Sequence, residues 1–488
     1  MKRLIFLIFC GIYSFSFAQV PPKPYGPVPS ARQLEWHKVE MYGLIHFTPT
    51  TFENKEWGYG DADPKIFNPA QFDAEQIVKA AKAGGLRGIV LVAKHHDGFA
   101  LWPTKTTEYN ITKSPFRDGK GDMVKEFADA ARNNGLKFGV YCSPWDRNSP
   151  HYGTPKYLEI YREQLRELYT NYGELFMSWH DGANGGDGYY GGAREKRSID
   201  NTVYYDWDST WSITRELQPM ANIFSDIGWD VRWVGNEKGI AGETHWATFT
   251  PKPAEGASAA VPGQANYPES PVGHRDGEFW MPAECDVPLR KGWFYHPGEK
   301  AKSVDELFSL FVQSVGRGAA LDLGLAPDTR GLLDDGDVEV LRAFGQKIEE
   351  TFKVNLLRAA NLRASNVRGY NSIYGTKNLI DGREETYWAT DDDFPTPYLT
   401  MTFSRPVTFD IFQIKENIKF GQRIEEFTLE AEENGEWREI HKGTSVGARR
   451  IVKFDSPVTA TRLRLKITKC PAAVVISEMG LYKEWQAQ

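Results

Sequence analysis

The segment from Glu174 to Gly186 reads Glu-Leu-Phe-Met-Ser-Trp-His-Asp-Gly-Ala-Asn-Gly-Gly. An apolar run, Leu175–Trp179, is followed at once by the carboxylate of Asp181 and then by a glycine-rich break. A parallel barrel buries its strands on all sides and carries its chemistry at their C-terminal ends. The segment is therefore typical of a barrel strand that delivers one acid to the open end. Taken alone, Asp181 before Gly182 is more often a turn or a helix cap, so the other strands must decide.

Strand-like and helix-like segments alternate from about residue 40 to about residue 345. This alternation implies βα units and a parallel sheet, and about 300 residues suit a (β/α)8 barrel with long loops. A doubly wound sheet is the competing fold, but no glycine-rich nucleotide fingerprint follows the first strand. The predicted strands are Met41–Phe47, Gly88–Ala93, Lys137–Cys142, Leu175–Trp179, Asn222–Ser225, Glu243–Ala247 and Ala319–Leu325, with an eighth not identified. The predicted helices are Asp73–Ala83, Asp122–Asn134, Pro155–Tyr172, Ser209–Leu217, Val304–Val315 and Asp334–Lys353.

The 488 residues are too many for one ordinary domain. After residue 353 the long helical patterns stop, and short runs that partly alternate apolar and polar residues follow one another between turn residues. This pattern indicates a β-sandwich. We therefore predict a signal peptide at residues 1–18, a (β/α)8-like catalytic domain at residues 19–353 and an all-β sandwich at residues 354–488. The predicted sandwich strands are Tyr398–Phe403, Phe409–Ile414, Phe427–Ala431, Ile451–Phe454 and Arg462–Ile467.

The N-terminus and the overall charge bear on location and partners. Met-Lys-Arg, an apolar stretch to Phe17 and a small residue at Ala18 make a secretory signal peptide, which is too short and wrongly flanked for a membrane span. We expect a protein exported to the periplasm without a membrane span. The formal net charge of −7 gives no basic patch, which argues against nucleic acid as a partner.

Chemically able side chains follow one predicted strand after another. They are His46 after the first strand, Lys94 to Phe99 after the second, Tyr141 to Trp145 at the third, His180 and Asp181 after the fourth, and Asp226 after the fifth. A single histidine at a strand end is more often structural than catalytic, and their joint occurrence is what favours a site. His95 and His96 could form a metal pair, but adjacent residues of a strand point to opposite faces and no third ligand is apparent.

A pocket of carboxylates, imidazoles and indoles suits a monosaccharide, whose hydroxyls need hydrogen bonds and whose C–H face packs on an aromatic ring. Two carboxylates facing one bond would make a glycosidase, with one nucleophile or base and one acid. The nucleophile must stay ionised, which Arg232 or a nearby histidine could assist, and the acid needs a raised pKa. Loops carrying Glu56-Trp57 and Phe279-Trp280 could cover the same opening.

Several motifs together resemble glycoside hydrolase family 29, the α-L-fucosidases. They are His46-Phe47, Glu56-Trp57, the string Lys94-His-His-Asp-Gly-Phe99, the strand ending Trp179-His-Asp-Gly-Ala183, and Val231-Arg-Trp-Val-Gly-Asn-Glu237. The resemblance covers most of residues 30–345. It implies that Asp181 is a nucleophile that forms a covalent fucosyl-enzyme with net retention, and that no cofactor is needed. It further implies a fucose pocket made of His46, Glu56, Trp57, His95, His96, Tyr141 and Trp280, and we expect Arg232 to join this pocket because of its charge.

The resemblance also bears on the acid and on the second domain. Trp233-Val-Gly-Asn-Glu237 resembles the branch acting on α-1,3/1,4-linked fucose of branched, Lewis-type glycans, which implies Glu237 as the acid, with Glu243 and Glu284 as alternatives. Leu379-Ile-Asp-Gly382 followed by Thr386-Tyr-Trp388 resembles discoidin-like (coagulation-factor type C) modules. Such a module could bind carbohydrate or only buttress the barrel, and both roles stay open.

Two rival functions remain at this point. One is a retaining barrel glycosidase for another sugar, and the other is a non-catalytic glycan-binding protein. The presence of both Asp181 and Glu237 favours the enzyme.

Overall fold

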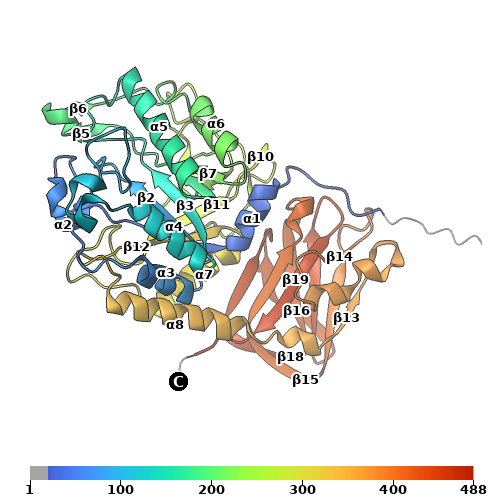
Figure 1. The fold of residues 1–488 in the computed structure, drawn as a ribbon. Coiled ribbons are helices and arrows are strands. Elements are labelled where there is room, and N and C mark those ends of the chain that lie inside the picture. Colours follow the sequence, from blue (N-terminus) through green and yellow to red (C-terminus); the bar gives the residue numbers. More distant parts are fainter. Residues whose placement is uncertain (1–19, 487–488) are drawn as a thin grey trace, which may run out of the picture.

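The structure, a computed structural model, describes residues 20–486 and places two domains side by side (Figure 1). The predicted signal peptide lies outside these residues. A first helix, α1 (Ala31–Val39), begins at a capping box made by Ser30 and Gln33. It leads directly into the first strand of the N-terminal domain. No helix between residues 20 and 486 combines the length and the hydropathy that a membrane span requires.

The N-terminal domain is a closed barrel of eight strands, all paired in parallel, as predicted. Strands of the barrel separate an inner hydrophobic cluster from an outer one. In β2 (Gly88–Lys94), Val90 and Val92 belong to the inner cluster, whereas Ile89 and Leu91 join the larger cluster under the helices. The strands, in barrel order, are β1 (Met41–Ile45), β12 (Ala320–Leu325), β11 (Ala283–Pro288), β8 (Val231–Trp233), β7 (Asn222–Ser225), β4 (Met177–Trp179), β3 (Lys137–Cys142) and β2.

Two of these strands escaped sequence analysis, and one predicted strand is wrong. β8 and β11 were not predicted, while Glu243–Ala247 forms no strand. In that segment the backbone of His245 and Ala247 bonds to side chains of the C-terminal domain instead of to a strand: Ser445 Oγ accepts from the His245 N–H at 2.8 Å and Gln422 Oε1 from the Ala247 N–H at 2.9 Å. This segment therefore belongs to a contact between the two domains.

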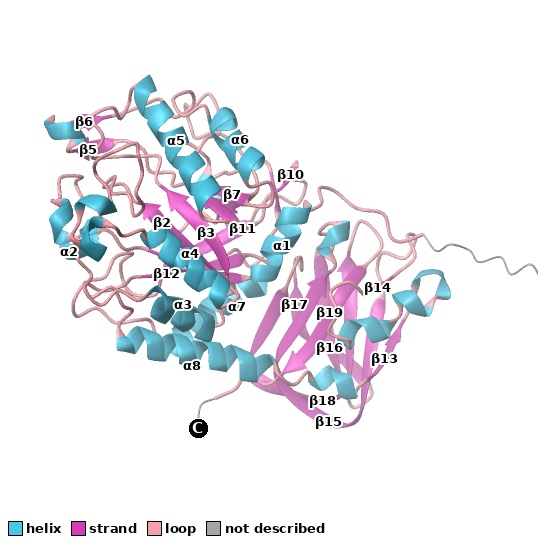
Figure 2. Ribbon diagram, viewed as in Figure 1, coloured by secondary structure: helices cyan, strands magenta, loops and turns pink. Residues whose placement is uncertain are grey.

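Helices cover much of the barrel's outer surface (Figure 2). Their starts follow ordinary capping chemistry: Asp73 accepts hydrogen bonds from the first backbone N–H groups of α3, and Asp122 does so for α4. The helices are α2 (Pro49–Phe52), α3 (Ala74–Ala83), α4 (Met123–Asn133), α5 (Pro155–Asn171), α6 (Trp207–Leu217), α7 (Val304–Gln313) and α8 (Asp335–Phe352). Two small antiparallel ribbons, β5 (Gly186–Gly188) with β6 (Glu195–Arg197) and β9 (Thr248–Phe249) with β10 (Phe279–Trp280), lie in the loops.

The C-terminal domain is antiparallel and all-β, as predicted. Two long strands, β15 (Tyr398–Glu416) and β18 (Arg450–Lys469), pair along their length with register shifts near Thr402 and Phe409. Each long strand contains two of the runs predicted as separate strands. Because β15 pairs with one neighbour before the shifts and another after them, the sheet wraps around its own core. The remaining strands are β13 (Asn361–Ala364), β14 (Trp388–Ala389), β16 (Glu426–Glu433), β17 (Glu436–Gly443) and β19 (Val475–Tyr482).

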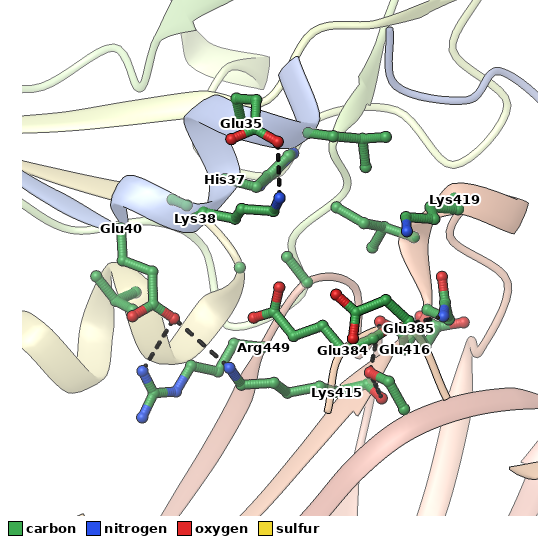
Figure 3. Close-up of a pocket in the computed structure, with 18 of the residues that line it drawn as sticks. Glu35, His37, Lys38, Glu40, Glu384, Glu385, Lys415, Glu416, Lys419 and Arg449 are labelled. Atoms are coloured by element: carbon green, nitrogen blue, oxygen red, sulfur yellow. Dashed lines mark hydrogen bonds and ion pairs between the residues drawn. The ribbon is translucent and has the colours of Figure 1, made fainter. Parts of the chain in front are cut away.

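A cavity of about 250 Å³ lies at the junction of the two domains, between α1 and the C-terminal domain (Figure 3). Its charged side chains largely pair with one another. Glu40 contacts Arg449 at 3.0 Å and Lys415 at 3.7 Å, and Glu35 contacts Lys38 at 2.6 Å. The cavity contains no strand-end residue of the barrel, so it is a feature of the domain junction and not of the candidate site.

Candidate active site

Asp181 lies immediately after β4, at the C-terminal end of the barrel. Its Oδ2 accepts a hydrogen bond from Tyr141 Oη at 3.1 Å, and its Oδ1 accepts one from the Ala183 N–H at 2.6 Å. The side chain is about a quarter exposed, with relative accessibility 25%. Burial raises the pKa of Asp181, while the bonds from Ala183 and Tyr141 oppose that rise. The result is a fixed, accessible carboxylate whose donors favour the ionised form.

Three imidazoles from two neighbouring strand ends lie beside this carboxylate. His96 Nε2 is 3.8 Å from Asp181 Oδ2, and its Nδ1 bonds Ser143 Oγ at 2.8 Å. The ring centres of His95 and His96 are 4.1 Å apart, and those of His46 and His95 are 5.5 Å apart. Burial lowers the pKa of His46 and of His96 to about 3, and that of His95 falls well below its ordinary value for the same reason. The three rings are therefore neutral near pH 7. A neutral imidazole has one donor and one acceptor nitrogen, and in His96 the Nδ1 is already engaged by Ser143, which leaves Nε2 for a ligand.

The loop after β11, within the irregular segment 250–300 that the sequence indicates as a functional loop, closes one side of the opening. Glu56 accepts hydrogen bonds from the backbone N–H of Trp293 at 2.9 Å and from His296 Nε2 at 2.6 Å. A side chain at Gly292 would place its Cβ only 2.2 Å from Glu56 Oε1, so the close approach requires glycine there. The Trp293 ring centre is 5.3 Å from that of His46. The signal available in the sequence was an aromatic pair, Trp293-Phe294, inside a long irregular segment.

Trp57 is the most open aromatic ring of this group, with relative accessibility 51%. Its edge meets the ring of His96 at 5.1 Å and that of Trp145 at 5.6 Å between centres. Because these two rings pack against the indole edge-on, Trp57 presents an accessible apolar surface at the opening.

Glu237 follows β8 and is exposed to solvent. Its pKa is raised, first by partial burial and then by the negative charges of Asp181 and Glu56, while hydrogen bonding from Trp293 opposes the rise. Because the charges of Asp181 and Glu56 both act on Glu237, its carboxyl lies near the same opening. The opening therefore holds two carboxyls: Asp181, whose ionised form two hydrogen-bond donors stabilise, and Glu237, whose protonated form two neighbouring carboxylates favour. A nucleophile and an acid require such a pair.

The two alternative acids lie elsewhere. Glu243 forms ion pairs with Arg317 at 2.8 Å and with Arg450 of the C-terminal domain, so it belongs to the domain junction. Glu284, on β11, is fully buried and accepts hydrogen bonds from Tyr42 Oη and from Trp179 Nε1, the latter at 2.8 Å. Neither carboxyl is open to a leaving group at the mouth of the barrel.

The prediction that Arg232 and Trp280 line the pocket is wrong. Arg232 is completely buried and donates to the backbone carbonyls of Met281, Trp246 and Ser270, so its guanidinium stabilises loops and is not exposed to a sugar. Trp280 is 5% exposed and packs with Ala247 and with Ile418, which belongs to the C-terminal domain. Its Nε1 is 3.2 Å from His37 Nε2. Both side chains serve the loop from β8 to β11.

His180 points away from the opening. Its Nδ1 is 2.7 Å from Tyr161 Oη on α5 and its Nε2 is 2.9 Å from Ser178 Oγ. It is 1% exposed, and burial lowers its pKa to about 3. Since neighbouring side chains of a strand point to opposite sides, the turn of Asp181 towards the pocket directs His180 to the layer between barrel and helices.

Asp226 is a further carboxylate beside the site. Its Oδ2 accepts from Tyr267 Oη at 2.5 Å and from the Gly263 N–H at 2.8 Å. Burial raises its pKa to about 6, and the charge of Asp181 adds to the rise. A Cβ at Gly182 would lie 2.0 Å from Asp226, so this glycine lets the loop after Asp181 pack against Asp226.

Comparison with known proteins agrees with this geometry. The family model Alpha-L-fucosidase matches residues 8–351, and the model F5/8 type C domain matches residues 361–479. Alpha-L-fucosidase 1 of Arabidopsis thaliana is 39% identical over 475 residues, covering 96% of this chain and 90% of the relative. Among solved structures, a glycoside hydrolase 29 family member from an unknown rumen bacterium has TM-score 0.84 and 39% identity, over 96% of this chain and 79% of that one. A Ruminococcus gnavus GH29 fucosidase in complex with fucose has TM-score 0.84 and 31% identity, over 96% and 97% of the two chains.

Proposed function

The chain belongs to the α-L-fucosidase family, glycoside hydrolase family 29, and on that premise we propose that it hydrolyses terminal fucose with retention through a covalent intermediate on Asp181. The observation that carries the proposal is the Asp181 carboxylate, partly open at the end of β4 and held by donors from Tyr141 and Ala183. The two rivals, a glycosidase for another sugar and a non-catalytic binder, lose support from the family membership.

In the first step, an oxygen of the Asp181 carboxylate attacks the anomeric carbon of fucose as the bond from that carbon to the leaving-group oxygen breaks. Glu237 transfers its proton to the departing oxygen, so the remaining glycan leaves as an alcohol. In the second step, Glu237 removes a proton from water as the water oxygen attacks the anomeric carbon. The ester bond to Asp181 breaks and fucose departs with its original configuration.

The two electrostatic environments support this division of roles. Donors from Ala183 and Tyr141 favour the ionised form of Asp181 against the effect of burial. Burial and the charges of Asp181 and Glu56 favour the protonated form of Glu237. A fucosyl ester on Asp181 removes one of those charges, which makes Glu237 a stronger acid and lets it serve as a base in the second step.

Recognition of fucose is assigned to the neutral imidazoles and to Tyr141. A neutral imidazole hydrogen-bonds a hydroxyl without the cost of burying a charge, which suits an uncharged deoxysugar. The half-exposed ring of Trp57 offers an apolar surface for the C–H face or methyl group of the sugar. A ligand of this kind is that of the Ruminococcus gnavus relative, whose structure contains fucose.

The linkage and the location are finer proposals. The motif Trp233-Val-Gly-Asn-Glu237 supports α-1,3/1,4-linked fucose on branched, Lewis-type glycans as the substrate. The N-terminal residues 1–18, with their basic start, apolar core and small terminal residue, support export to the periplasm.

The test uses wild type, Asp181→Ala and Glu237→Ala with an aryl α-L-fucoside and a Lewis-type trisaccharide. We expect fucose release by wild type, near-complete loss in Asp181→Ala, and rescue of Glu237→Ala by azide on the aryl substrate to give a fucosyl azide of retained configuration. Undiminished turnover by Asp181→Ala would refute the nucleophile. An azide product with inverted configuration in Glu237→Ala would refute the assignment of the acid.

A further inference from the structure

The ring of helices around the barrel has a gap beside β7 and β8. Five residues, Asp226 to Asp230, are all that join these two parallel strands, whereas a parallel pair is normally joined through a helix. Asp230 has already returned to the start of β7, where its Oδ2 accepts from the Ile223 N–H at 2.8 Å. The next link, from β8 to β11, contains no α-helix either. Side chains and loops therefore cover this sector in place of a helix.

An aromatic pocket of about 720 Å³ occupies the gap. Its walls come from α6, from the short link between β7 and β8, and from the segment before β11. We name it the gap pocket after its main side chains, Trp207, Trp211, Trp229, Val261, Phe279 and Met281. Trp229 and Phe279 are open to solvent, with relative accessibilities of 38% and 48%. Trp211 supports Trp229 edge-on, with 5.7 Å between ring centres.

The polar groups of the gap pocket indicate which ligand charge it favours. Thr202, Asp206 and Asp208 lie among its lining residues, and no lysine or arginine does. Asp208 is exposed, and Asp206 bonds Arg162 at 3.0 Å. Arg215 lies over the Trp229 ring at 5.8 Å, but its guanidinium is engaged by Asp230 and by the Ala221 carbonyl. Acidic groups without a free cation disfavour an anionic ligand and suit hydroxyl donors.

Rigid aromatic faces with a few hydrogen-bonding groups at the edge suit a pyranose ring, which has an apolar C–H face and a rim of hydroxyls. A purely apolar ligand would gain nothing from the hydroxyl and the two carboxylates of the lining. A sialylated or sulfated unit would face uncompensated negative charge. The chemistry that matches all the lining groups is therefore a neutral saccharide.

The gap pocket shares a wall with the loop of the nucleophile. Ile227 and Gly228 line it and directly follow Asp226, on which Gly182 rests. Pro262 also lines it, and its carbonyl oxygen accepts from Asn201 Nδ2 at 3.2 Å and from Asn184 Nδ2 at 3.4 Å. Asn184 is three residues beyond Asp181. A ligand in the pocket would therefore lie against the outer side of the catalytic loops.

From this arrangement we propose that the gap pocket is a second saccharide-binding site, which holds a neutral sugar unit other than the fucose that is cleaved. This proposal rests on the proposed function of the barrel, because it assumes that the protein acts on glycans. The bound unit belongs either to the same oligosaccharide or to another branch of a multivalent glycan. The sugar chemistry is the same in both cases. They differ in which glycan loses affinity when the pocket is altered.

The test pairs binding with turnover. In an Asp181→Ala background, Trp229→Ala and Phe279→Ala, singly and together, are titrated with N-acetyllactosamine, with a Lewis-type trisaccharide and with a multivalent fucosylated glycoprotein. We expect affinity to fall about ten-fold or more in the double variant. A fall with the trisaccharide assigns the bound unit to the same oligosaccharide, and a fall with the glycoprotein alone assigns it to another branch. Tyr398→Ala, which removes a ring of 47% exposure from β15, is the matched control.

Turnover separates this proposal from the function of the barrel. With Asp181 intact, the double variant is expected to keep wild-type kcat/KM on an aryl α-L-fucoside, whereas failure of wild type on that substrate would count against the barrel's function alone. Phe279→Ala serves as the second variant if loss of Trp229 lowers the melting temperature. Equal affinity of the double variant and the control for all three ligands would overturn the second site.

Discussion

Replacing Tyr141 by phenylalanine tests how the protein keeps its nucleophile ionised. The substitution keeps the ring, which lies 4.8 Å from the Trp179 ring, and removes only the donor to Asp181 Oδ2. Hydrogen bonds to charged groups contribute about 1.5–3 kcal/mol, and the separation of 3.1 Å is longer than the usual 2.5–2.7 Å for a hydroxyl and a carboxylate. We therefore take the lower end, about 1.5 kcal/mol, which corresponds to about one pKa unit.

The sign follows from which form the bond stabilises. Tyr141 donates to the ionised carboxylate, so its loss raises the pKa of Asp181, which burial already raises. A higher pKa leaves less of the nucleophile ionised at acidic pH. The acid limb of kcat/KM should therefore move to higher pH by about one unit. The assay is kcat/KM of an aryl α-L-fucoside from pH 3 to 8.

The control is Tyr109→Phe, because the Tyr109 hydroxyl has no hydrogen-bond partner among residues 20–486. It should leave the limb in place. A limb that stays fixed in Tyr141→Phe, or moves to lower pH, would refute the reasoning even if the plateau fell, since a lower plateau alone reports only lost contact with the sugar.

Three further predictions concern groups whose placement the structure decides. Glu237→Gln should lower kcat/KM about 100-fold or more on a Lewis-type trisaccharide and much less on an aryl fucoside with an acidic phenol, and equal losses on both would contradict a proton donor. Glu284→Gln should keep turnover and flatten the pH dependence of stability: burial raises the pKa of Glu284 to about 7, so its contribution to stability is complete below about pH 4.5 and is lost as pH rises towards 7. Urea unfolding of wild type and Glu284→Gln at pH 5 and pH 8 measures the difference in free energy of unfolding between the two pH values. The same difference in both proteins would count against this role of Glu284. His180→Phe should lower the melting temperature, because Tyr161 and Ser178 lose their partner, and should leave the acid limb of kcat/KM unmoved.

The barrel was predictable where a strand has an apolar centre and falls in the alternation of strands and helices. Lys137–Cys142 and Asn222–Ser225 were predicted with the bounds that the structure has. β11 escaped because it reads Ala283-Glu-Cys-Asp-Val-Pro, with two carboxyls in six residues. Those carboxyls are buried and find donors across the barrel: Tyr42 and Trp179 for Glu284, and Trp233 at 2.7 Å for Asp286. A hydrophobic pattern does not register polar groups that are satisfied only by tertiary contacts.

The site residues also divide into those that strand ends position and those that tertiary contacts position. Those at strand ends, such as His46 and Asp181, were predictable because the barrel itself directs strand ends to one mouth. Arg232 shows the opposite case, since a charged residue in a strand can turn towards loop carbonyls and the sequence does not record its direction. Trp293 reaches the opening through the contact of its loop with Glu56, far away in the chain.

The C-terminal domain takes part in the catalytic architecture whether or not it also binds sugar. The segment after β8 carries Glu237, and it has no helix to hold it against the barrel. Six residues later Glu243 bonds Arg450, then His245 and Ala247 bond Ser445 and Gln422, all from the second domain. Arg275, near the end of the same segment, pairs with Glu425. The C-terminal domain thus supplies the anchoring that a helix gives elsewhere in the barrel, so the loop that carries Glu237 depends on it while the strand before Asp181 does not. A binding role would be an addition to this structural one, because these contacts use residues beside the domain junction and leave the exposed Tyr370 and Ile373 uninvolved.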